Sequence, residues 1–406
     1  MDNLKTNQEL GRELDLYMGS EIVGSGLPLL TPKGATIKRE IERYVIDEEL
    51  KRGYLHTSTP EIAKKDLFEV SGHWQHYKDH MFSCDVGDET FAMRPMTCPF
   101  HFLLYGRKQR SYRDLPIRYA EMANLFRNEV TGTLGGLTRL RQFTLSDAHL
   151  LCRPDQVDDE FEGVMNLIGD TTKTLGINDT WYRFSLWDPQ NNKGKYVDNP
   201  EAWDQTQTTM KRMLDKFGLE YVTEEGEAAF YGPKLDLQYR NIHGKEDTLI
   251  TVQMDFALPE RFDLTYVDEA GQRQRPMVIH RSSSGCTERT MAYILEKTQG
   301  KLPLWLSPTQ TKVLAITEDV NDYAKQVNRR LLDAGVRSEG DLRNEKLGYK
   351  IREANAEKVP YMLIVGRNEK EGKQVSVRKR GEKQNVLMGL EHLAKTLTHE
   401  IATRTN

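Results

Sequence analysis

Cysteine is scarce in this chain, and no two cysteines form a close pair. The 406 residues include only 4 cysteines, at positions 84, 98, 152 and 286. The absence of any CxxC pair argues against a disulfide framework and against a self-contained zinc knuckle. A single cysteine is most often a small buried apolar residue. Because unpaired cysteines are typical of a reducing compartment, we expect a cytoplasmic protein.

Long apolar stretches are missing as well. No apolar run approaches the roughly 20 residues that a membrane-spanning helix requires. The first residues, MDNLKTNQEL, lack the apolar core of a signal peptide. Charged residues make up 29% of the chain and hydrophobic residues 38%, which is typical of a globular protein in water. We therefore expect two or three domains and no membrane partner.

The net charge of −4 neither favours nor excludes a nucleic-acid partner, but the charge is unevenly distributed. Residues 311–406 contain 19 Lys and Arg against 14 Asp and Glu, whereas residues 1–310 contain 38 against 47. The basic part includes RKRGEK at 378–383. Such a cluster is more often a solvated face than a polyanion site. A functional cluster of this kind would contact phosphates.

The apolar pattern of the first three quarters predicts an α+β fold with a mainly antiparallel sheet. A helix is expected over 36–52, with Ile37, Ile41, Tyr44, Val45 and Leu50 at helical spacing and Gly53 at its end. Further helices are expected near 155–175, 200–217 and 286–299. Extended segments, several of them alternating, are TFAMRPM, LPIRYAEMANLFRNEV, LRQFTLSDAHLL, KLDLQYRNI, TLITVQMDFALP and RPMVIHRS.

The composition changes at 301–310, KLPLWLSPTQ, where two prolines flank a tryptophan. Beyond this point, strands and helices alternate in a pattern typical of an α/β domain with mixed strands. Expected strands are 311–316, 336–341, 360–365 and 373–378, and expected helices are 320–334, 345–356 and 388–402. We place the boundary near 305, which gives domains of 1–304 and 305–406.

Three segments carry residue types suited to nucleotide chemistry, although each has an ordinary structural explanation. FRNE at 126–129, with RQF at 141–143, offers an arginine fork for phosphate and an aromatic ring for a base. A salt bridge within a hairpin would explain Arg127 and Glu129 equally well. GCTER at 285–289 places Arg289 at the start of a helix, where a surface arginine is the simpler interpretation. The segment from Gly53 to Pro60 is weak evidence by itself.

In this order, the 53–60, 126–143 and 285–289 segments resemble the three signature motifs of class II aminoacyl-tRNA synthetases. Other segments follow the order and approximate spacing of the threonyl-tRNA synthetase family. They are MTCPFH, SDAH, AFYGPK, TVQMDF, VIHRSSSGCTER, WLSPTQ, DLRNEKLGYKIREA and VPYMLIVG. The resemblance covers nearly the whole chain. It implies a class II antiparallel sheet with flanking helices and a C-terminal α/β anticodon-binding domain.

The resemblance also implies one zinc ion per chain, held by Cys98, His149 and His280, each on a strand-like segment. Three protein ligands leave room for a substrate, here the amino group and hydroxyl of threonine. Valine lacks that hydroxyl, and a site built to bind it can reject valine by about 10⁴–10⁵. His101 is expected to line the pocket.

The remaining site residues are implied by the same resemblance. The substrate-binding set is Met96, Asp147, Tyr231 and Lys234. The set that binds ATP with Mg²⁺ is Arg127, Glu129, Arg139, Phe143, Gln253 and Arg289. The anticodon-reading set is Asn344, Glu369 and Arg378, each of which could also be a plain surface residue. The implied partners are tRNA(Thr) and a second copy of the chain, paired through 36–52 and 53–60 in a homodimer.

Several residues depart from the family's usual pattern. They are Phe100, Gln142, Leu145, Ala228 and Cys286, and residues 246–250, EDTLI, lack a usual aromatic-containing stretch. Because these positions cluster in sequence around the pocket motifs, we expect Phe100 and Leu145 to add bulk beside the zinc ligands.

Three interpretations stay open at this point. The chain starts close to the catalytic motifs, so one is an active compact threonine–tRNA ligase without N-terminal editing domains. Mischarged serine would then be cleared by a separate trans-editing protein. A second is a non-catalytic paralogue that binds tRNA or a partner, and a third is an active copy altered to resist an inhibitor. Arg127, Arg289 and the expected zinc ligands are all present, which favours an active enzyme.

Overall fold

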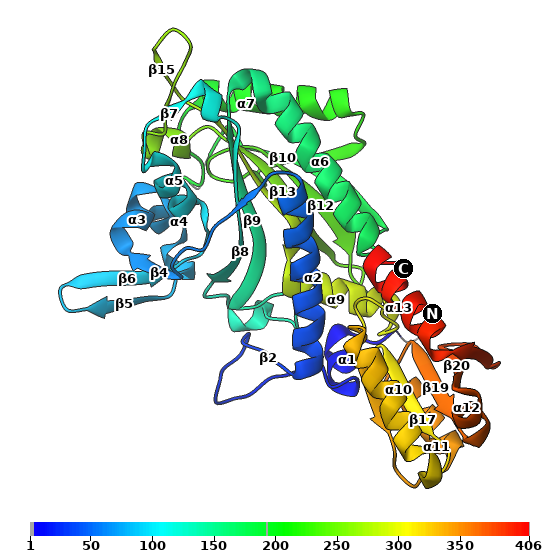
Figure 1. Ribbon diagram of the computed structural model, residues 1–406. Helices are drawn as coiled ribbons and strands as arrows, with labels where there is room; N and C mark the ends of the chain where they lie inside the picture. Colours follow the sequence, from blue (N-terminus) through cyan, green and yellow to red (C-terminus); the bar gives the residue numbers. More distant parts are fainter. Residues whose placement is uncertain (1–3, 192–193, 406) are drawn as a thin grey trace.

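The computed structural model describes residues 4–191 and 194–405. Its larger part is built on an eight-stranded sheet, with the long helix α2 (Pro32–Lys51) running beside it (Figure 1). In spatial order the strands are β11 (Tyr221–Glu225), β10 (Thr180–Leu186), β12 (Lys234–Arg240), β13 (Glu246–Asp255), β16 (Met277–Cys286), β9 (Gln142–Cys152), β8 (Ile117–Phe126) and β3 (Leu55–His56).

Most neighbouring strands in this sheet are antiparallel, as predicted. The two edge pairs, β10–β11 and β3–β8, are parallel. The expected helices are also present, as α2, α6 (Val157–Thr174), α7 (Pro200–Phe217) and α9 (Thr287–Thr298). Helices α2, α6 and α9 share one buried apolar core with the sheet, which includes Ile41, Val164, Met254 and Met291.

The two ends of helix α2 are determined by local sequence. The Thr31 side chain accepts a hydrogen bond from the backbone of Gly34, and Pro32 stands in the first turn, where its missing N–H costs nothing. The helix ends before Gly53, whose φ of +76° favours glycine. Leu50, expected on the apolar face, is instead 53% exposed.

Smaller elements surround the sheet. At the N-terminus these are α1 (Asn7–Glu13), β1 (Tyr17–Met18) and β2 (Leu29–Leu30). Beside the sheet lie β4 (Ile62–Lys64), α3 (Lys65–Val70), α4 (His73–Tyr77), β5 (Ser83–Val86), β6 (Glu89–Met93), α5 (Cys98–Gly106), β7 (Arg110–Ser111), α8 (Leu258–Arg261), β14 (Tyr266–Val267) and β15 (Arg273–Gln274). Strands β4, β6 and β5 form a separate antiparallel sheet.

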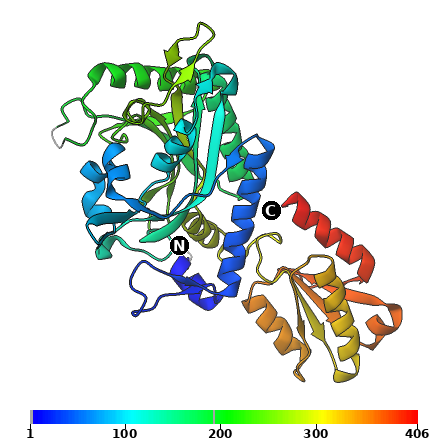
Figure 2. The same cartoon turned by 60° about the vertical axis from the view of Figure 1, so that its left-hand side comes forward.

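The C-terminal part has its own sheet (Figure 2). It also has its own apolar core, which includes Val313, Leu331, Leu363 and Leu397. Its strand order is β18 (Ser338–Asp341), β17 (Thr311–Ala315), β19 (Tyr361–Val365), β20 (Gln374–Lys379) and β21 (Val386–Gly389). The helices are α10 (Asn321–Asp333), α11 (Leu347–Ala356), α12 (Arg367–Gly372) and α13 (Leu390–Thr403). The mixed strand directions agree with the prediction, whereas α12 and β21 were not predicted.

Side chains of the C-terminal part contact α2. Arg404 stacks on the ring of Tyr44, with 4.8 Å between guanidinium carbon and ring centroid. Arg337 lies 3.5 Å from the carboxylate of Glu40. The position of the domain boundary at 305 stays a prediction. Among the described residues, none of the helices has the length and apolar character needed to span a membrane.

Candidate functional site

Three side chains that are far apart in sequence converge at the middle of the eight-stranded sheet. His149 on β9 and His280 on β16 are direct partners in the strand register. Cys98 is the first residue of α5, so the expectation that it lies on a strand-like segment is wrong. Pro99 explains the difference, because proline is well tolerated in the first turn of a helix. One potential ligand atom from each residue lies within 4.8 Å of the others, and all three residues are buried.

The unpaired nitrogens of this cluster indicate whether the cluster could bind a metal ion. His149 Nε2 and His280 Nδ1 are buried and have no hydrogen-bond partner among the described residues. Buried polar atoms are normally satisfied, so two such nitrogens beside a free thiol require an explanation. Two imidazole nitrogens and one cysteine sulfur are a donor set that suits zinc and leaves a coordination position open. These residues therefore fit the implied ion.

Burial sets the protonation of the cluster. It raises the pKa of the Cys98 thiol well above its usual range, and the carboxylates of Asp147 and Asp255 raise it further. Burial also lowers the pKa of His149 well below its usual range, helped by the neighbouring His280. His149 is therefore neutral, the form that binds a metal. Zinc binding would have to displace the proton of Cys98.

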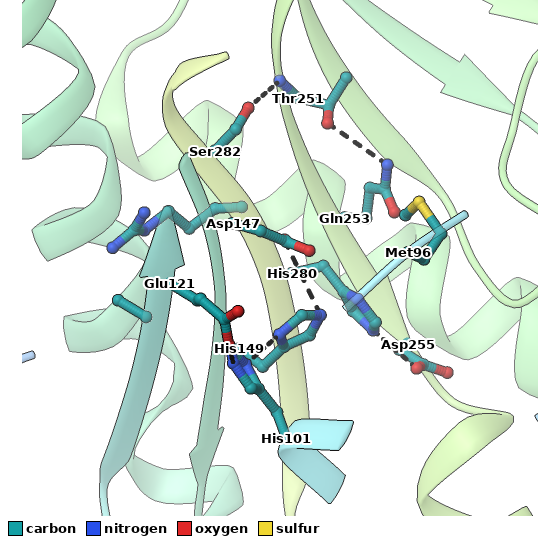
Figure 3. Close-up of polar contacts among 12 residues, drawn as sticks. Met96, His101, Glu121, Asp147, His149, Thr251, Gln253, Asp255, His280 and Ser282 are labelled. Carbon is teal, nitrogen blue, oxygen red and sulfur yellow. Dashed lines mark hydrogen bonds and ion pairs between the residues drawn. The ribbon is translucent and has the colours of Figure 1, made fainter. Parts of the chain in front are cut away.

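Asp147 provides a free acceptor beside this cluster. It lies two residues before His149 on β9, so both side chains are on the same face of the sheet. Its Oδ1 is 3.9 Å from His149 Nε2, beyond hydrogen-bond distance, and its Oδ2 has no partner among the described residues. Burial raises its pKa, although nearby histidines oppose the shift. Figure 3 shows Asp147 pointing to the same region as His149 and His280.

The strand register places more of the expected residues in one row. Lys234 on β12 is paired with Gln253 on β13, which is paired with His280, which is paired with His149. Directly paired residues of antiparallel strands share a face. Tyr231 stacks on His280 with ring centroids 4.8 Å apart, and its hydroxyl donates to Gln253 Oε1. The four strands thus place Lys234, expected to bind the substrate, and Gln253, expected to bind ATP, in one row with the two histidines.

Lys234 and Met96 also have defined partners. Lys234 Nζ lies 2.9 Å from Asp236 Oδ2 in an ion pair. The sulfur of Met96 is 3.1 Å from Arg127 Nη2. Met96 therefore contacts one expected ATP residue, Arg127, and belongs to the segment that leads to Cys98.

The expected phosphate and adenine residues lie next to this row. Arg127 and Glu129 follow β8 in a loop, and the Arg127 guanidinium stacks on Phe143 of β9 at 5.0 Å from its ring centroid. Arg289, in the first turn of α9, donates to the backbone oxygens of Thr138 and Thr248 at 2.9 and 2.6 Å. The neighbouring Arg139 lines a cavity of about 600 Å³. Of these three arginines, Arg127 lies near the metal-binding cluster, where its charge acts on the Cys98 thiol.

The residues that depart from the family pattern do not form one site. Phe100 packs against Phe68 at 6.2 Å between ring centroids, in an apolar cluster separate from that of Cys98. The expectation that it adds bulk beside the zinc ligands is wrong, because successive helix residues point in different directions. Leu145 does share the face of Asp147 and His149. Ala228 packs elsewhere, with Trp203.

Two further departures, Gln142 and Cys286, have local surroundings of their own. Gln142 is an exposed residue at the first position of β9. The Cys286 sulfur lies 3.4 Å from Glu288 Oε2, which accepts a hydrogen bond from the backbone of Thr144. These contacts belong to the junction of β9 and α9.

The three residues expected to read the anticodon lie in the C-terminal part. Asn344 follows β18 and Glu369 belongs to α12 after β19, at the carboxyl ends of two parallel strands, where α/β sheets bind ligands. Arg378 on β20 donates to Asn385 Oδ1 at 2.7 Å. Glu369 accepts from the backbone of Gly366 and from Ser376 Oγ at 2.9 and 2.8 Å, so it also holds α12 in place.

The supporting roles of His101 and Asp255 behind the two histidines were not predicted. His101 Nδ1 lies 2.8 Å from His149 Nδ1, and His280 Nε2 lies 2.7 Å from Asp255 Oδ2. His101 is fully buried behind His149 and does not face an open pocket. The available signals were the three-residue spacing from Cys98 to His101, which suits one face of a helix, and the two-residue spacing from Gln253 to Asp255.

Comparison with known families agrees with this geometry. Residues 80–298 match the family model for the tRNA synthetase class II core domain (G, H, P, S and T), and residues 308–400 match the model for an anticodon binding domain. The chain therefore belongs to the class II tRNA synthetases.

Within this class, the chain is similar to threonine-specific enzymes, as its motifs predict. It is 54% identical over 404 residues to a threonine–tRNA ligase of Clostridium botulinum, covering 98% of this chain and 63% of the relative. A threonine–tRNA ligase of Anoxybacillus flavithermus is 49% identical over 399 residues, with 98% and 62% covered. The chain thus spans less than two thirds of these relatives' lengths.

Solved structures show the same relationship. The RNA binding domain of threonyl-tRNA synthetase from Cryptosporidium parvum superposes with a TM-score of 0.92 and 34% identity, covering 97% of this chain and 98% of that one. A prolyl-tRNA synthetase from the same organism is 16% identical with a TM-score of 0.73, covering 98% and 76%. The second likeness concerns the fold alone.

Proposed function

We propose that this chain acts as a threonine–tRNA ligase. It activates threonine with ATP to threonyl-adenylate and pyrophosphate, and then transfers the threonyl group to the 3′ end of tRNA(Thr). The observation that carries this proposal is the meeting of Cys98, His149 and His280 on a class II sheet, with Asp147 beside them. The similarity to threonine–tRNA ligases supports the choice of amino acid.

Threonine is selected through its hydroxyl group. A zinc ion held by Cys98 Sγ, His149 Nε2 and His280 Nδ1 would supply an electrophilic position for the amino group and hydroxyl of the substrate. Asp147, with a free carboxylate oxygen, accepts a hydrogen bond from the hydroxyl. Tyr231 borders the amino group. Valine would leave these buried polar groups unpaired, which costs far more than a missing methyl group.

ATP binds at the expected aromatic and arginine residues. Phe143 stacks on adenine, Glu129 contacts the adenine edge, and Arg127 binds the α-phosphate after leaving its stacked position on Phe143. Arg139 and Arg289 hold the terminal phosphates together with Mg²⁺, and Lys234 and Gln253 contact the adenylate. A carboxylate oxygen of threonine bonds to the α-phosphorus as pyrophosphate leaves, a step that depends on positioning and charge neutralisation.

The C-terminal part binds the anticodon arm of tRNA(Thr). Asn344, Glu369 and Arg378 are proposed to read its unstacked bases. The active form is a cytoplasmic homodimer, paired through α2 and the segment 53–60. A monomer in light scattering at micromolar concentration would contradict this assembly.

ATP–pyrophosphate exchange with threonine, serine and valine tests the proposal. We expect exchange with threonine, weaker exchange with serine and almost none with valine. Prior removal of the metal with a chelator should abolish the exchange, and added zinc should restore it. Protein that exchanges none of the three amino acids when loaded with zinc would contradict the proposed activity. Full activity in metal-free protein would contradict the proposed role of zinc.

A further inference from the structure

The two histidines of the metal-binding cluster are each held from behind by a different buried group. We propose that His101 and Asp255 are positioning residues that fix His149 and His280 in opposite tautomers, so that one presents Nε2 and the other Nδ1 to the metal. This inference rests on the proposed function, because it assumes that the cluster binds zinc. It concerns residues behind the ligand set, not the ligands themselves.

The tautomer of His149 follows from where the protons of His149 and His101 must lie. His149 Nδ1 and His101 Nδ1 are 2.8 Å apart, so a hydrogen bond there requires one proton, on one nitrogen only. If Nε2 of neutral His149 is to bind a metal, its proton must be on Nδ1 and must be donated to His101. His101 must then carry its own proton on Nε2. The tautomer of His101 thus decides which nitrogen of His149 is free.

The groups behind His101 favour that tautomer. His101 Nε2 lies 2.9 Å from Thr57 Oγ1 and 3.6 Å from Glu121 Oε2, a negative charge that favours a donor on that side. Thr57 Oγ1 donates to Glu121 Oε2 at 3.3 Å, so its lone pairs are free to accept a hydrogen bond from His101 Nε2. Arg94 Nη1 donates to the other oxygen of Glu121 at 2.9 Å. A buried ion pair therefore orients the whole series, of which Figure 3 labels Glu121, His101 and His149.

The second tautomer is fixed by one carboxylate. His280 Nε2 lies 2.7 Å from Asp255 Oδ2, an acceptor, so the single proton of a neutral His280 sits on Nε2 and Nδ1 stays free. The other oxygen, Oδ1, accepts from the backbone N–H groups of Ala257 and Leu258, both at 2.9 Å. Because two backbone donors hold Oδ1, only Oδ2 is available to the histidine.

When both tautomers are already fixed, no part of the free energy of metal binding is used to change them. Partners of this kind typically change metal affinity by about 10–100-fold. They also fix the ring orientations: the His149 and His280 rings meet edge to face, with centroids 4.5 Å apart. We therefore expect His101 and Asp255 to affect the retention and geometry of the metal without contacting threonine.

Asp255→Asn is the sharper of two test variants. Its amide oxygen should stay on the two backbone donors, so its NH₂ group would face His280 Nε2 and could not accept a proton. Asp268→Asn is the matched control, because Asp268 Oδ1 also accepts from two backbone N–H groups, of Ala270 and Gln272, but lies at an exposed turn. Asp255→Asn should bind zinc about 10–100-fold more weakly, and Asp268→Asn should match the unsubstituted chain.

His101→Phe removes the acceptor for His149 Nδ1, whereas His101→Asn can still offer an amide oxygen. We expect a loss of zinc affinity of about 10–100-fold in the first and a smaller loss in the second. Phe100→Leu is the control on the same helix, since Phe100 packs in a separate cluster. It should keep its zinc even if packing around α5 is loosened.

Zinc affinity is measured by competition with a chelator of known affinity, after circular dichroism has shown that each variant is folded. The absorption spectrum of the cobalt-substituted protein reports the ligand geometry independently of activity. Affinities and cobalt spectra of His101→Phe and Asp255→Asn that equal those of the unsubstituted chain would overturn the inference. Absence of zinc binding by the unsubstituted chain would instead contradict the zinc role in the proposed function, so the two failures are distinguishable.

Discussion

The guanidinium of Arg281 and the carboxylate of Glu49 form a 2.7 Å ion pair between two buried side chains. The pair joins α2 to strand β16, next to His280. Glu49 also accepts from Ser283 Oγ at 2.8 Å, and Arg281 stacks on Tyr54 at 4.2 Å. The helix that precedes the first signature motif is therefore tied to the strand that carries a candidate metal ligand.

Breaking this pair should destabilise the fold strongly. Glu49→Gln leaves the buried positive charge of Arg281 without its negatively charged partner, which typically costs about 3–5 kcal/mol. Urea denaturation followed by circular dichroism measures the free energy of unfolding. Glu48→Gln is a matched control, because Glu48 pairs with the more exposed Lys51 and Arg52 and should cost about 1 kcal/mol or less. Equal losses in both variants would contradict the assigned role of the buried pair.

The same carboxylate should contribute to stability in acid. Burial by itself would raise the pKa of Glu49, but the charge of Arg281 and the hydrogen bonds from His56 and Ser283 outweigh burial and lower it. The contribution is thus complete above the usual glutamate pKa of about 4.3 and is lost as pH falls through the lower folded-state value. As pH falls below about 4.3, Glu49→Gln should therefore lose less stability than the unsubstituted chain. A steeper loss in the variant would refute this.

Removing the thiol should remove the metal. Cys98→Ser replaces a thiolate ligand with a poor zinc ligand, so zinc content should fall from about one per chain to near zero. Threonine-dependent ATP–pyrophosphate exchange should fall with it. Elemental analysis measures the first and the exchange assay the second. Cys84→Ser, at an exposed cysteine, should change neither, and a Cys98→Ser protein that keeps its zinc would rule out this ligand.

The C-terminal part should affect tRNA but not adenylate formation. Arg378→Ala removes a cationic fork from β20, so aminoacylation of tRNA(Thr) should weaken while ATP–pyrophosphate exchange stays unchanged. Arg329→Ala is a suitable control, because Arg329 pairs with Asp333 within α10 at a surface position. Equal losses in the two assays would mean that Arg378 supports the fold instead of the tRNA.

Selectivity should be strong against valine and weak against serine. Serine keeps the hydroxyl and lacks only a methyl group, which binding discriminates by about 10–200-fold. Valine lacks the hydroxyl and should be rejected by about 10⁴–10⁵. The measured quantity is kcat/KM in the exchange assay. Rejection of serine by more than about 10⁴-fold would exceed what one methyl group supplies and would require a further device in the pocket.

The sequence by itself determined the class of protein and the residue types of the candidate site. The order of MTCPFH, SDAH and VIHRSSSGCTER is a property of the chain alone, and so is the apolar periodicity that predicted α2, α6, α7 and α9. The alternation typical of antiparallel strands predicted the central sheet. These features are local, so they can be recognised before the chain is folded.

Only the tertiary structure decided which atoms meet. Whether Phe100 or His101 points to the metal-binding cluster depends on the rotation of α5, and the pairing of His149 with His280 depends on the register of two strands more than 100 residues apart. The free nitrogen of each histidine is set by a buried partner from another segment, His101 in one case and Asp255 in the other. Such relations arise from packing between distant segments, whereas local spacing places residues on a shared face without fixing which atoms meet.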